Sequence, residues 1–209
     1  MREGNILYEK MIEFLGLCVQ NLIKSIKYLF QVRFSSVIAQ AAAISYDSLP
    51  ISLIIAFIAA AVITIQVSKQ FLMSGAEAYI GGTIAVVMIR EIAPGFVALA
   101  IGARAGTAIS AEIANMQVTS QVDAMKTLKV DPVGYYFTPR IIAGMLTVPM
   151  VVLLAELVGI TGGMLVSQAA IDLHPARYMN SAWLWISTRD IYISLLKGAI
   201  FGGLISLVC

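Results

Sequence analysis

The sequence has little charge for its length. Lys, Arg, Asp and Glu account for 12% of its 209 residues and hydrophobic residues for 59%, whereas roughly a quarter of the residues in a soluble domain are charged. A soluble globular protein is therefore excluded, and the composition predicts an integral membrane protein. The formal net charge of +2 is too small for a strong polyanion binder, so we expect no nucleic acid partner.

Histidine and cysteine are also scarce. The single histidine, His174, precedes a proline in a loop, and the two cysteines, Cys18 and Cys209, form no CxxC pair, so neither a disulfide nor a zinc site is expected. The sequence contains no phosphate-binding loop, no H-E-x-x-H motif and no G-x-S-x-G motif. We therefore predict no catalytic residue, metal site or cofactor in this chain, and no ATP hydrolysis by the chain itself.

The N-terminal segment, residues 1–47, is too charged to cross a bilayer. Its longest uncharged run, residues 14–23, is ten residues long, about half of what a spanning helix needs. Polar and apolar residues nevertheless alternate with helical spacing, which predicts an amphipathic helix lying in the membrane interface. The polar positions are Glu9, Glu13, Gln20, Lys24, Lys27 and Gln31, and the apolar positions are Met11, Ile12, Leu15, Leu22, Ile26 and Leu29.

The remaining residues, 48–209, are predicted to form one transmembrane domain. It contains four apolar stretches long enough to span a bilayer, so the expected fold is an all-α membrane bundle of four helices. These stretches are residues 48–68, 79–114, 141–171 and 191–209. The distribution of Lys and Arg places the N-terminus and the central loop, residues 116–140, on the cytoplasmic side.

Three prolines bear on the shapes of these helices. Pro50 falls near the start of the first stretch, where its missing N–H is harmless, and Pro149 predicts a kink in the third. The second stretch, as one helix, would be about 54 Å long at about 1.5 Å per residue, so it must bend or protrude. Pro94 with Gly95 is the expected break, because Pro94 cannot donate to the carbonyl of Arg90.

The central loop contains a short amphipathic helix of its own. Val118, Val122, Met125 and Leu128 recur at helical spacing, Ser120 with Asp123 resembles a capping box, and Asp131-Pro132 ends the helix. The apolar face of this helix lies either on the bundle or lipid headgroups, or in a cytosolic partner; the pattern alone favours neither.

A stripe of small residues precedes the central loop. Small side chains at four-residue intervals allow another helix backbone to approach closely. The partner helix belongs either to the same chain, which is the commoner case, or to a second copy. The residues of the stripe are Ala98, Gly102, Gly106, Ser110 and Ala114.

Three ionisable residues lie within the apolar stretches: Arg90, Glu91 and Glu156. Charges at membrane depth are costly and usually face a bundle interior or a wet cavity, so a functional role is the first interpretation. The alternative is a structural Arg–Glu pair that holds helices together. Since adjacent residues do not face each other on a helix, Arg90 and Glu91 are expected to have different partners.

Several ordered motifs around the central loop carry a family resemblance. They are Arg90-Glu91-Ile92-Ala93-Pro94, the run from Ala103 to Ile113, the run from Met116 to Met125, and Val130-Asp131-Pro132 with Pro139-Arg140. Together they resemble the MlaE-type permease, the membrane subunit of MCE-associated lipid ABC transporters. The similarity covers roughly residues 50–170 and extends through Gly75-Ala76-Glu77-Ala78, Glu156 and Gly162-Gly163.

The resemblance implies a phospholipid transporter. In the family, two permease copies surround a central lipid cavity, bind a pair of ATPase subunits that hold ATP and Mg²⁺, and meet a ring of MCE-domain proteins. It also implies five spans where this chain has four, and a bacterial inner membrane or a chloroplast envelope.

The family motifs assign residues to two roles. Arg90 and Glu91 match the charged pair of the lipid cavity, to which we add Glu156. The residues that match the ATPase-coupling motif are Ser120, Gln121, Val122, Asp123 and Met125, and Ser120 stands where the family usually has Glu.

Two other functions compete with an ABC permease subunit. An ion-coupled secondary transporter of an amphiphile could relay protons through Glu91 and Glu156, but the chain lacks the paired inverted segments that such carriers often show. A purely structural membrane scaffold is the third possibility, and the charges at membrane depth argue against it.

Overall fold

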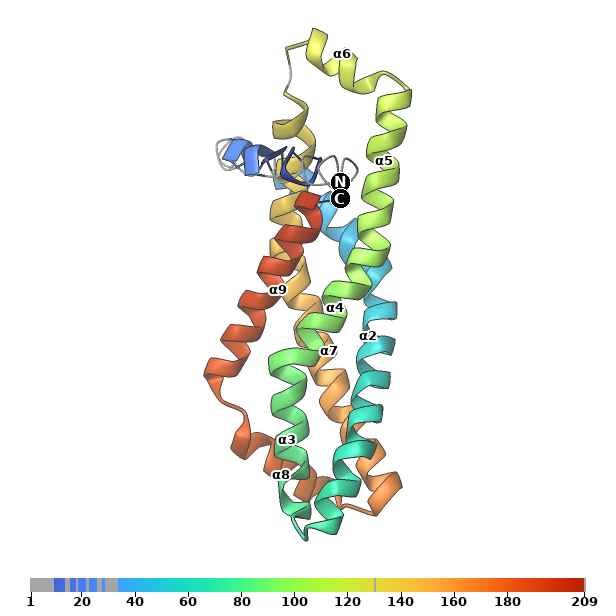
Figure 1. Ribbon diagram of the computed structural model, residues 1–209, viewed down its shortest axis with the longest axis vertical. Coiled ribbons are helices and arrows are strands. Elements are labelled where there is room, and N and C mark those ends of the chain that lie inside the picture. The colour runs from blue at the N-terminus through green and yellow to red at the C-terminus, as the bar shows by residue number, and fades with distance from the viewer. Residues whose placement is uncertain are drawn as a thin grey trace, which may run out of the picture.

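The protein is an elongated bundle of helices (Figure 1). The computed structural model describes residues 10–13, 16–17, 19–21, 23–25, 28, 34–129 and 131–208, with only the backbone at residue 133. Within these residues the chain is helical apart from short connections and contains no strand, so the predicted all-α membrane fold is confirmed.

The described residues cover only part of the predicted N-terminal amphipathic helix. The described residues between 10 and 28 are helical, and Met11 and Ile12 are exposed. Seven of the twelve residues that carried the prediction lie outside the described residues: Glu9, Leu15, Leu22, Ile26, Lys27, Leu29 and Gln31.

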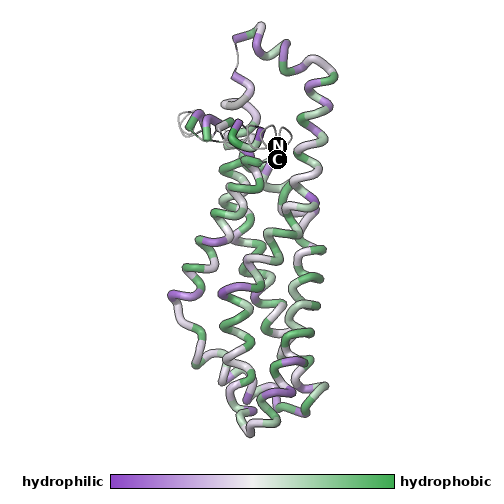
Figure 2. Tube along the Cα trace, viewed as in Figure 1, coloured by the Kyte–Doolittle hydropathy of each residue, from purple (hydrophilic) through white to green (hydrophobic). Residues whose placement is uncertain are grey.

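Four helical segments of the described chain are long and apolar enough to cross a membrane, as predicted: Phe34–Met73, Glu77–Val118, Gly134–Ile171 and Thr188–Val208. Hydrophobic residues follow them along the bundle, and hydrophilic residues concentrate toward its ends (Figure 2). The α-helices are α2 (Phe34–Met73), α3 (Ile80–Val87), α4 (Ala93–Ile101), α5 (Thr107–Val118), α6 (Gln121–Thr127), α7 (Thr138–Ile171), α8 (Pro175–Trp185) and α9 (Thr188–Val208). The 3₁₀ segment η2 (Glu77–Tyr79) and the π-helical segments η3 (Met88–Ile92), η4 (Gly102–Gly106) and η5 (Val133–Phe137) complete the chain order.

The first spanning helix begins earlier than predicted. Helix α2 starts at Phe34, so Pro50 lies inside the helix and not in its first turn. The expectation for Pro50 was wrong because residues 34–46 contain no charge, glycine or proline that would end a helix before the apolar stretch.

The second spanning helix bends without breaking at Pro94. Helical structure runs from Glu77 to Val118, and the π-helical segment η3 precedes Pro94 in place of the predicted interruption. A π turn accommodates a missing hydrogen bond while the helix continues. The excess length forms α5, which projects beyond the bundle (Figure 1).

Small residues let the long helices approach closely. On α2, small side chains are buried at four-residue intervals: Ser48, Ser52, Ala56, Ala60, Thr64 and Ser68. On α9 a Cβ at Gly202 would lie 2.2 Å from the carbonyl oxygen of Gly144 in α7, and a Cβ at Gly198 would lie 3.1 Å from Cα of Pro149. Helices α7 and α9 are therefore in backbone contact, as is common in membranes.

This contact predicts the effect of one added methyl group. Gly202→Ala should lower the free energy of unfolding by about 1–3 kcal/mol, because α7 and α9 must separate to admit the Cβ. Thermal unfolding in detergent measures the change. Gly95→Ala is the matched control, since a Cβ there meets nothing within 4 Å. Equal stability of the two variants would contradict the backbone contact.

Candidate functional site

One face of α9 carries the partners of the three predicted membrane-depth charges. Asp190, Ser194 and Lys197 are spaced i, i+4 and i+7 and so lie on one stripe of the helix. Their partners are Arg90, Glu156 and Glu91, respectively. We call these three α9 residues the polar stripe. Helix α9 therefore connects all three charges, which come from two other spanning segments.

Arg90 forms an ion pair with Asp190. Both Nε and Nη2 of the arginine lie 2.8 Å from Oδ1 of the aspartate, and Oδ2 accepts a hydrogen bond from the Ser187 N–H at 3.3 Å. The Asp190 side chain is only 3% exposed, whereas that of Arg90 is 53% exposed. The arginine therefore neutralises a buried carboxylate and still presents part of its guanidinium at the surface.

Glu91 pairs with Lys197 at 2.9 Å, and Glu91 is 74% exposed. The same ammonium group donates to the backbone carbonyl of Arg90 at 2.6 Å. Pro94, four residues on, has no N–H to offer that carbonyl. Lys197 thus binds the carbonyl that the proline leaves without its usual partner, and the expectation that Arg90 and Glu91 have different partners is confirmed.

Glu156 lies in a different environment. It is buried in α7, where the Ser194 hydroxyl donates to Oε1. It lines an apolar groove between α7, α8 and α9, not the surface on which Arg90 and Glu91 are exposed. The structure relates Glu156 to the other two charges only through the polar stripe.

A second, larger groove begins beside Glu91. It has a volume of about 780 Å³, runs between α4 and α9, and is open along its length. Its walls are apolar apart from Glu91; they include Ile92, Phe96, Leu99, Phe201, Leu204 and Ile205. We call it the α4–α9 groove. It joins a charged end to a long apolar surface.

The residues of the predicted small-residue stripe lie in different surroundings. Ala98 and Gly102 line the α4–α9 groove, Gly106 is buried, and Ser110 and Ala114 are exposed on α5. The π-helical segment η4 interrupts the α-helical period within the stripe, so its members do not form one continuous seam. Contact with a second copy of the chain stays a prediction.

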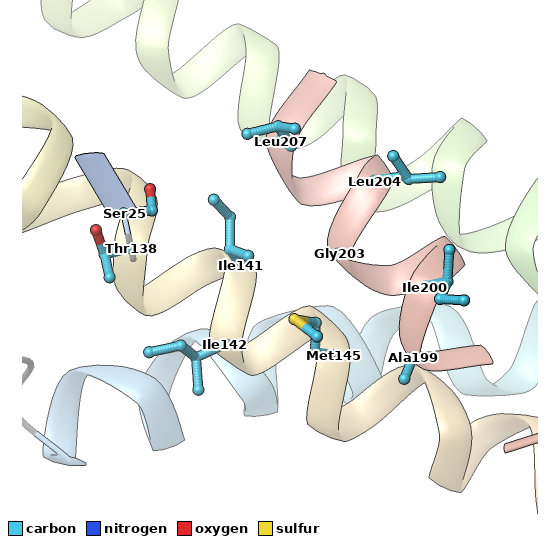
Figure 3. A pocket seen from close by; sticks show the side chains of 10 residues that line it. All are labelled: Ser25, Thr138, Ile141, Ile142, Met145, Ala199, Ile200, Gly203, Leu204 and Leu207. Carbon is cyan, nitrogen blue, oxygen red and sulfur yellow. The ribbon is translucent and has the colours of Figure 1, made fainter. Parts of the chain in front are cut away.

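A third apolar pocket lies toward the end of the bundle nearer α6 (Figure 3). It has a volume of about 390 Å³ and lies between α7, α9 and Ser25 of the N-terminal segment. The residues of its wall are Thr138, Ile141, Ile142, Met145, Ala199, Ile200, Gly203, Leu204 and Leu207. The wall carries no charge, so the pocket suits only apolar groups.

Helix α6, the predicted coupling helix, stands away from the bundle (Figure 1). None of its residues is buried, and the flanking Val118 and Leu128 are 84% and 74% exposed. The predicted packing of its apolar face on the bundle is therefore wrong, and its placement on the headgroups or in a cytosolic partner stays a prediction. The predicted capping box is also wrong: Ser120 has a left-handed backbone with φ 56° and makes no capping hydrogen bond, and Asp123 pairs with Lys126 at 3.3 Å.

Arg140 connects the arm that carries α6 to the bundle. Its guanidinium forms an ion pair with Glu112 of α5, donates to Gln40 of α2 at 3.2 Å, and lies 5.0 Å from the ring centre of Tyr136. The side chain is almost completely buried. The sequence indicated Arg140 only as part of a motif. A permanent charge that ends up buried at a helix start needs such partners.

A second contact joins the central loop, near its end, to the N-terminal segment. The Tyr28 hydroxyl donates a hydrogen bond to the carboxylate of Asp131, which raises the pKa of Tyr28, because deprotonation would lose this hydrogen bond and place a phenolate beside a negative charge. The described N-terminal residues and the central loop therefore meet at the same end of the bundle (Figure 1).

Comparison with known proteins identifies the family. The profile described as Permease MlaE matches residues 37–209. The chain belongs to the MlaE permease family. A probable ABC transporter permease protein of Rickettsia prowazekii is 34% identical over 195 residues, which are 93% of this chain and 73% of the relative. A probable ABC transporter permease protein of Synechocystis is 36% identical over 162 residues, 78% of this chain and 62% of the relative.

A plant relative extends the comparison. The chloroplastic protein TRIGALACTOSYLDIACYLGLYCEROL 1 of Arabidopsis thaliana is 34% identical over 145 residues, which are 69% of this chain and 41% of the relative. The chain is thus an ABC transporter permease of the MlaE family, a transport component of the membrane, and is similar to bacterial and chloroplast proteins.

The ion pair at Asp190 predicts a specific pattern of stability. Arg90→Ala should lower the free energy of unfolding by on the order of 2 kcal/mol, because it leaves a buried carboxylate unpaired. Adding Asp190→Asn should recover much of that loss. The exposed pair Asp123–Lys126 is the control, since Lys126→Ala should cost about 0–1 kcal/mol. Thermal unfolding of all four proteins tests this, and a double variant less stable than Arg90→Ala would contradict it.

Proposed function

We propose that this permease moves phospholipid, or a related amphiphile, between membranes, with ATP hydrolysed by a partner subunit. The observation that carries the proposal is the exposed Glu91 in the wall of the apolar α4–α9 groove, with the exposed Arg90 next to it in the chain. Charges exposed within a membrane span usually mark a substrate pathway. An amphiphile has the same division into a polar head and an apolar tail.

The geometry suits a lipid in two respects. The Arg90 guanidinium, half exposed beside Asp190, can donate hydrogen bonds to a phosphate, and Glu91 can attract a cationic headgroup. The groove beyond them has no charged wall residue other than Glu91, so it suits acyl chains. The name of the Arabidopsis relative contains that of a glycolipid, which supports a lipid as the class of substrate.

The position of α6 supports docking to an ATPase. We infer a membrane boundary at the exposed ion pair between Asp47 and Arg104, 3.8 Å apart, because arginine is frequent where a spanning helix enters the cytoplasm. At about 1.5 Å per residue, the helix from Arg104 to Val118 carries α6 about 20 Å beyond that boundary. This is too far for α6 to rest on the headgroups next to the bundle, so a protein partner is the better explanation for its apolar residues.

The remaining features of the proposal come from the family resemblance and the charge distribution. They are a second copy of the chain, which closes the groove into a shared cavity, an MCE-domain partner at the α8 end, and ATP and Mg²⁺ held by the ATPase. The excess of Lys and Arg supports a cytoplasmic position for α6 and the N-terminus. The membrane is then the bacterial cytoplasmic membrane or a chloroplast envelope.

The substrate role of Glu91 is testable without disturbing the fold. Glu91→Ala should reduce ATP-driven lipid transfer between vesicles, because the charge at the end of the groove is lost. Glu91 is exposed, and without it Lys197 keeps the Arg90 carbonyl as a partner, so the complex should still assemble. Glu77→Ala removes an exposed acid outside the groove and is the control. Transfer unchanged by Glu91→Ala, or driven by a proton gradient instead of ATP, would contradict the proposal.

The docking role of α6 gives a separate prediction. Val122→Asp should abolish co-purification of the ATPase, because a buried, unpaired carboxylate costs several kcal/mol in an apolar contact. The permease itself should stay folded, since α6 buries no residue in the bundle. Lys126→Ala, on the same helix, tests whether any change in α6 has this effect. Undiminished co-purification of the Val122→Asp variant would show that α6 docks no ATPase.

A further inference from the structure

Helix α8 is fixed against the bundle by one face. The Gly82 N–H donates to Oγ of Ser181 at 3.0 Å, and a Cβ at Gly81 would lie 2.1 Å from the carbonyl oxygen of Tyr178. Tyr178 is fully buried. The close contact at two glycines of α3 means that α8 holds a defined position at the end of the bundle opposite α6 (Figure 1).

The depth of α8 follows from the helix lengths. Starting from the boundary marked by Arg104, a hydrocarbon core of about 30 Å corresponds to about 20 helical residues, so the opposite boundary lies near residue 84. The Trp185 indole packs on Gly82, where a Cβ would lie 2.6 Å from its Cγ, and the ring lies 5.9 Å from that of Tyr79. These aromatic rings are therefore at the membrane–water boundary, where Trp and Tyr are enriched.

The two sides of α8 differ in polarity. On one side, Arg177 and Asn180 line a pocket that also contains Glu77 and the apolar Trp185. On the other side, Met179 and Trp183 line the apolar groove that contains Glu156. The helix thus presents a charged side and an apolar side, as expected of a helix lying in a membrane interface.

The apolar side faces a groove of about 260 Å³ between α7, α8 and α9. Its wall is apolar apart from Thr161 and Glu156, whose carboxylate is bound by Ser194. Trp183 at its edge is 71% exposed, and Leu157 of α7 is also exposed. The groove is continuous with the exposed apolar surface of the spanning helices, so lipid is the medium that it meets.

We propose that the groove beneath Trp183 binds one acyl chain of a lipid in the leaflet at the α8 end, with the indole at the boundary of the headgroups. The site is lined by different residues from the α4–α9 groove, and the proposal does not depend on transport. Glu156 at its base is almost completely buried and accepts a hydrogen bond from Ser194, so an apolar chain in the groove meets mainly apolar side chains.

The two tryptophans of the sequence both lie in α8, which makes intrinsic fluorescence a direct probe. The variant Trp185→Phe leaves Trp183 as the only tryptophan. It is incubated in phosphatidylcholine vesicles brominated near the carbonyl end, the middle or the methyl end of the acyl chain. We expect strongest quenching by bromine near the carbonyl end, and some quenching should persist after extraction into lipid-free detergent because the groove retains a chain.

A groove-filling substitution separates a bound chain from the surrounding bilayer. In the same background, Thr161→Phe should abolish the quenching that persists in detergent and leave the quenching in vesicles unchanged. Leu154→Phe, on the exposed surface of α7 outside the groove, is the matched control and should retain both. Ile191→Phe fills the groove from α9 and replaces Thr161→Phe if that variant does not fold.

Three results would overturn the proposal. The first is the absence of retained quenching in the Trp185→Phe protein. The second is retained quenching that the groove-filling variants do not reduce. The third is quenching by aqueous iodide without quenching by brominated lipid, which would place Trp183 in water or against a protein partner instead of lipid.

Discussion

Inside a bilayer no water is available to polar groups, and the contacts of α9 with the charged residues of the second and third spans satisfy this constraint. Lys197 binds both the Glu91 carboxylate and the backbone carbonyl that Pro94 leaves without its usual partner. Arg90 neutralises the buried Asp190, and Ser194 donates to the buried Glu156. Without the polar stripe, three costly groups at membrane depth would lack the partners described here.

The second spanning helix combines three roles. Its segment near Arg90 bends through η3 and carries the exposed charges, its middle lines the α4–α9 groove, and its extension α5 carries α6 away from the membrane. One nearly continuous helix thus joins the proposed substrate site to the proposed ATPase contact. Arg140 holds the base of the extension against α2 and α7.

The two apolar grooves differ in their walls and so suit two different kinds of bound lipid. The α4–α9 groove combines an apolar surface with exposed charges, as a transported amphiphile requires. The groove beneath Trp183 has a mainly apolar wall, in which Glu156 is buried and hydrogen-bonded by Ser194, as a retained lipid requires. The polar stripe links the two, since Ser194 contacts Glu156 and Lys197 contacts Glu91.

Much of the architecture was predictable because it depends on the composition of successive stretches of the chain and not on contacts between distant residues. Apolar stretches of sufficient length determined the number of spans, the distribution of Lys and Arg indicated the shared end of α6 and the N-terminus, and ordered motifs indicated the family. Helix limits were less predictable. Pro50 looked like a first-turn residue, yet α2 extends back to Phe34 because no residue between them ends the helix.

The sequence by itself determined the membrane class, the spans, the family and the identity of the membrane-depth charges Arg90, Glu91 and Glu156. The tertiary structure decided which groups meet these charges, that Glu156 lies apart from the exposed pair, and that α6 leaves the bundle. The partners Asp190 and Lys197 are about one hundred residues from Arg90 and Glu91 in the chain. A local sequence pattern shows which face of a helix is polar or apolar, but not which helix packs against that face. These pairings therefore follow only from the close approach of α9 to its neighbours.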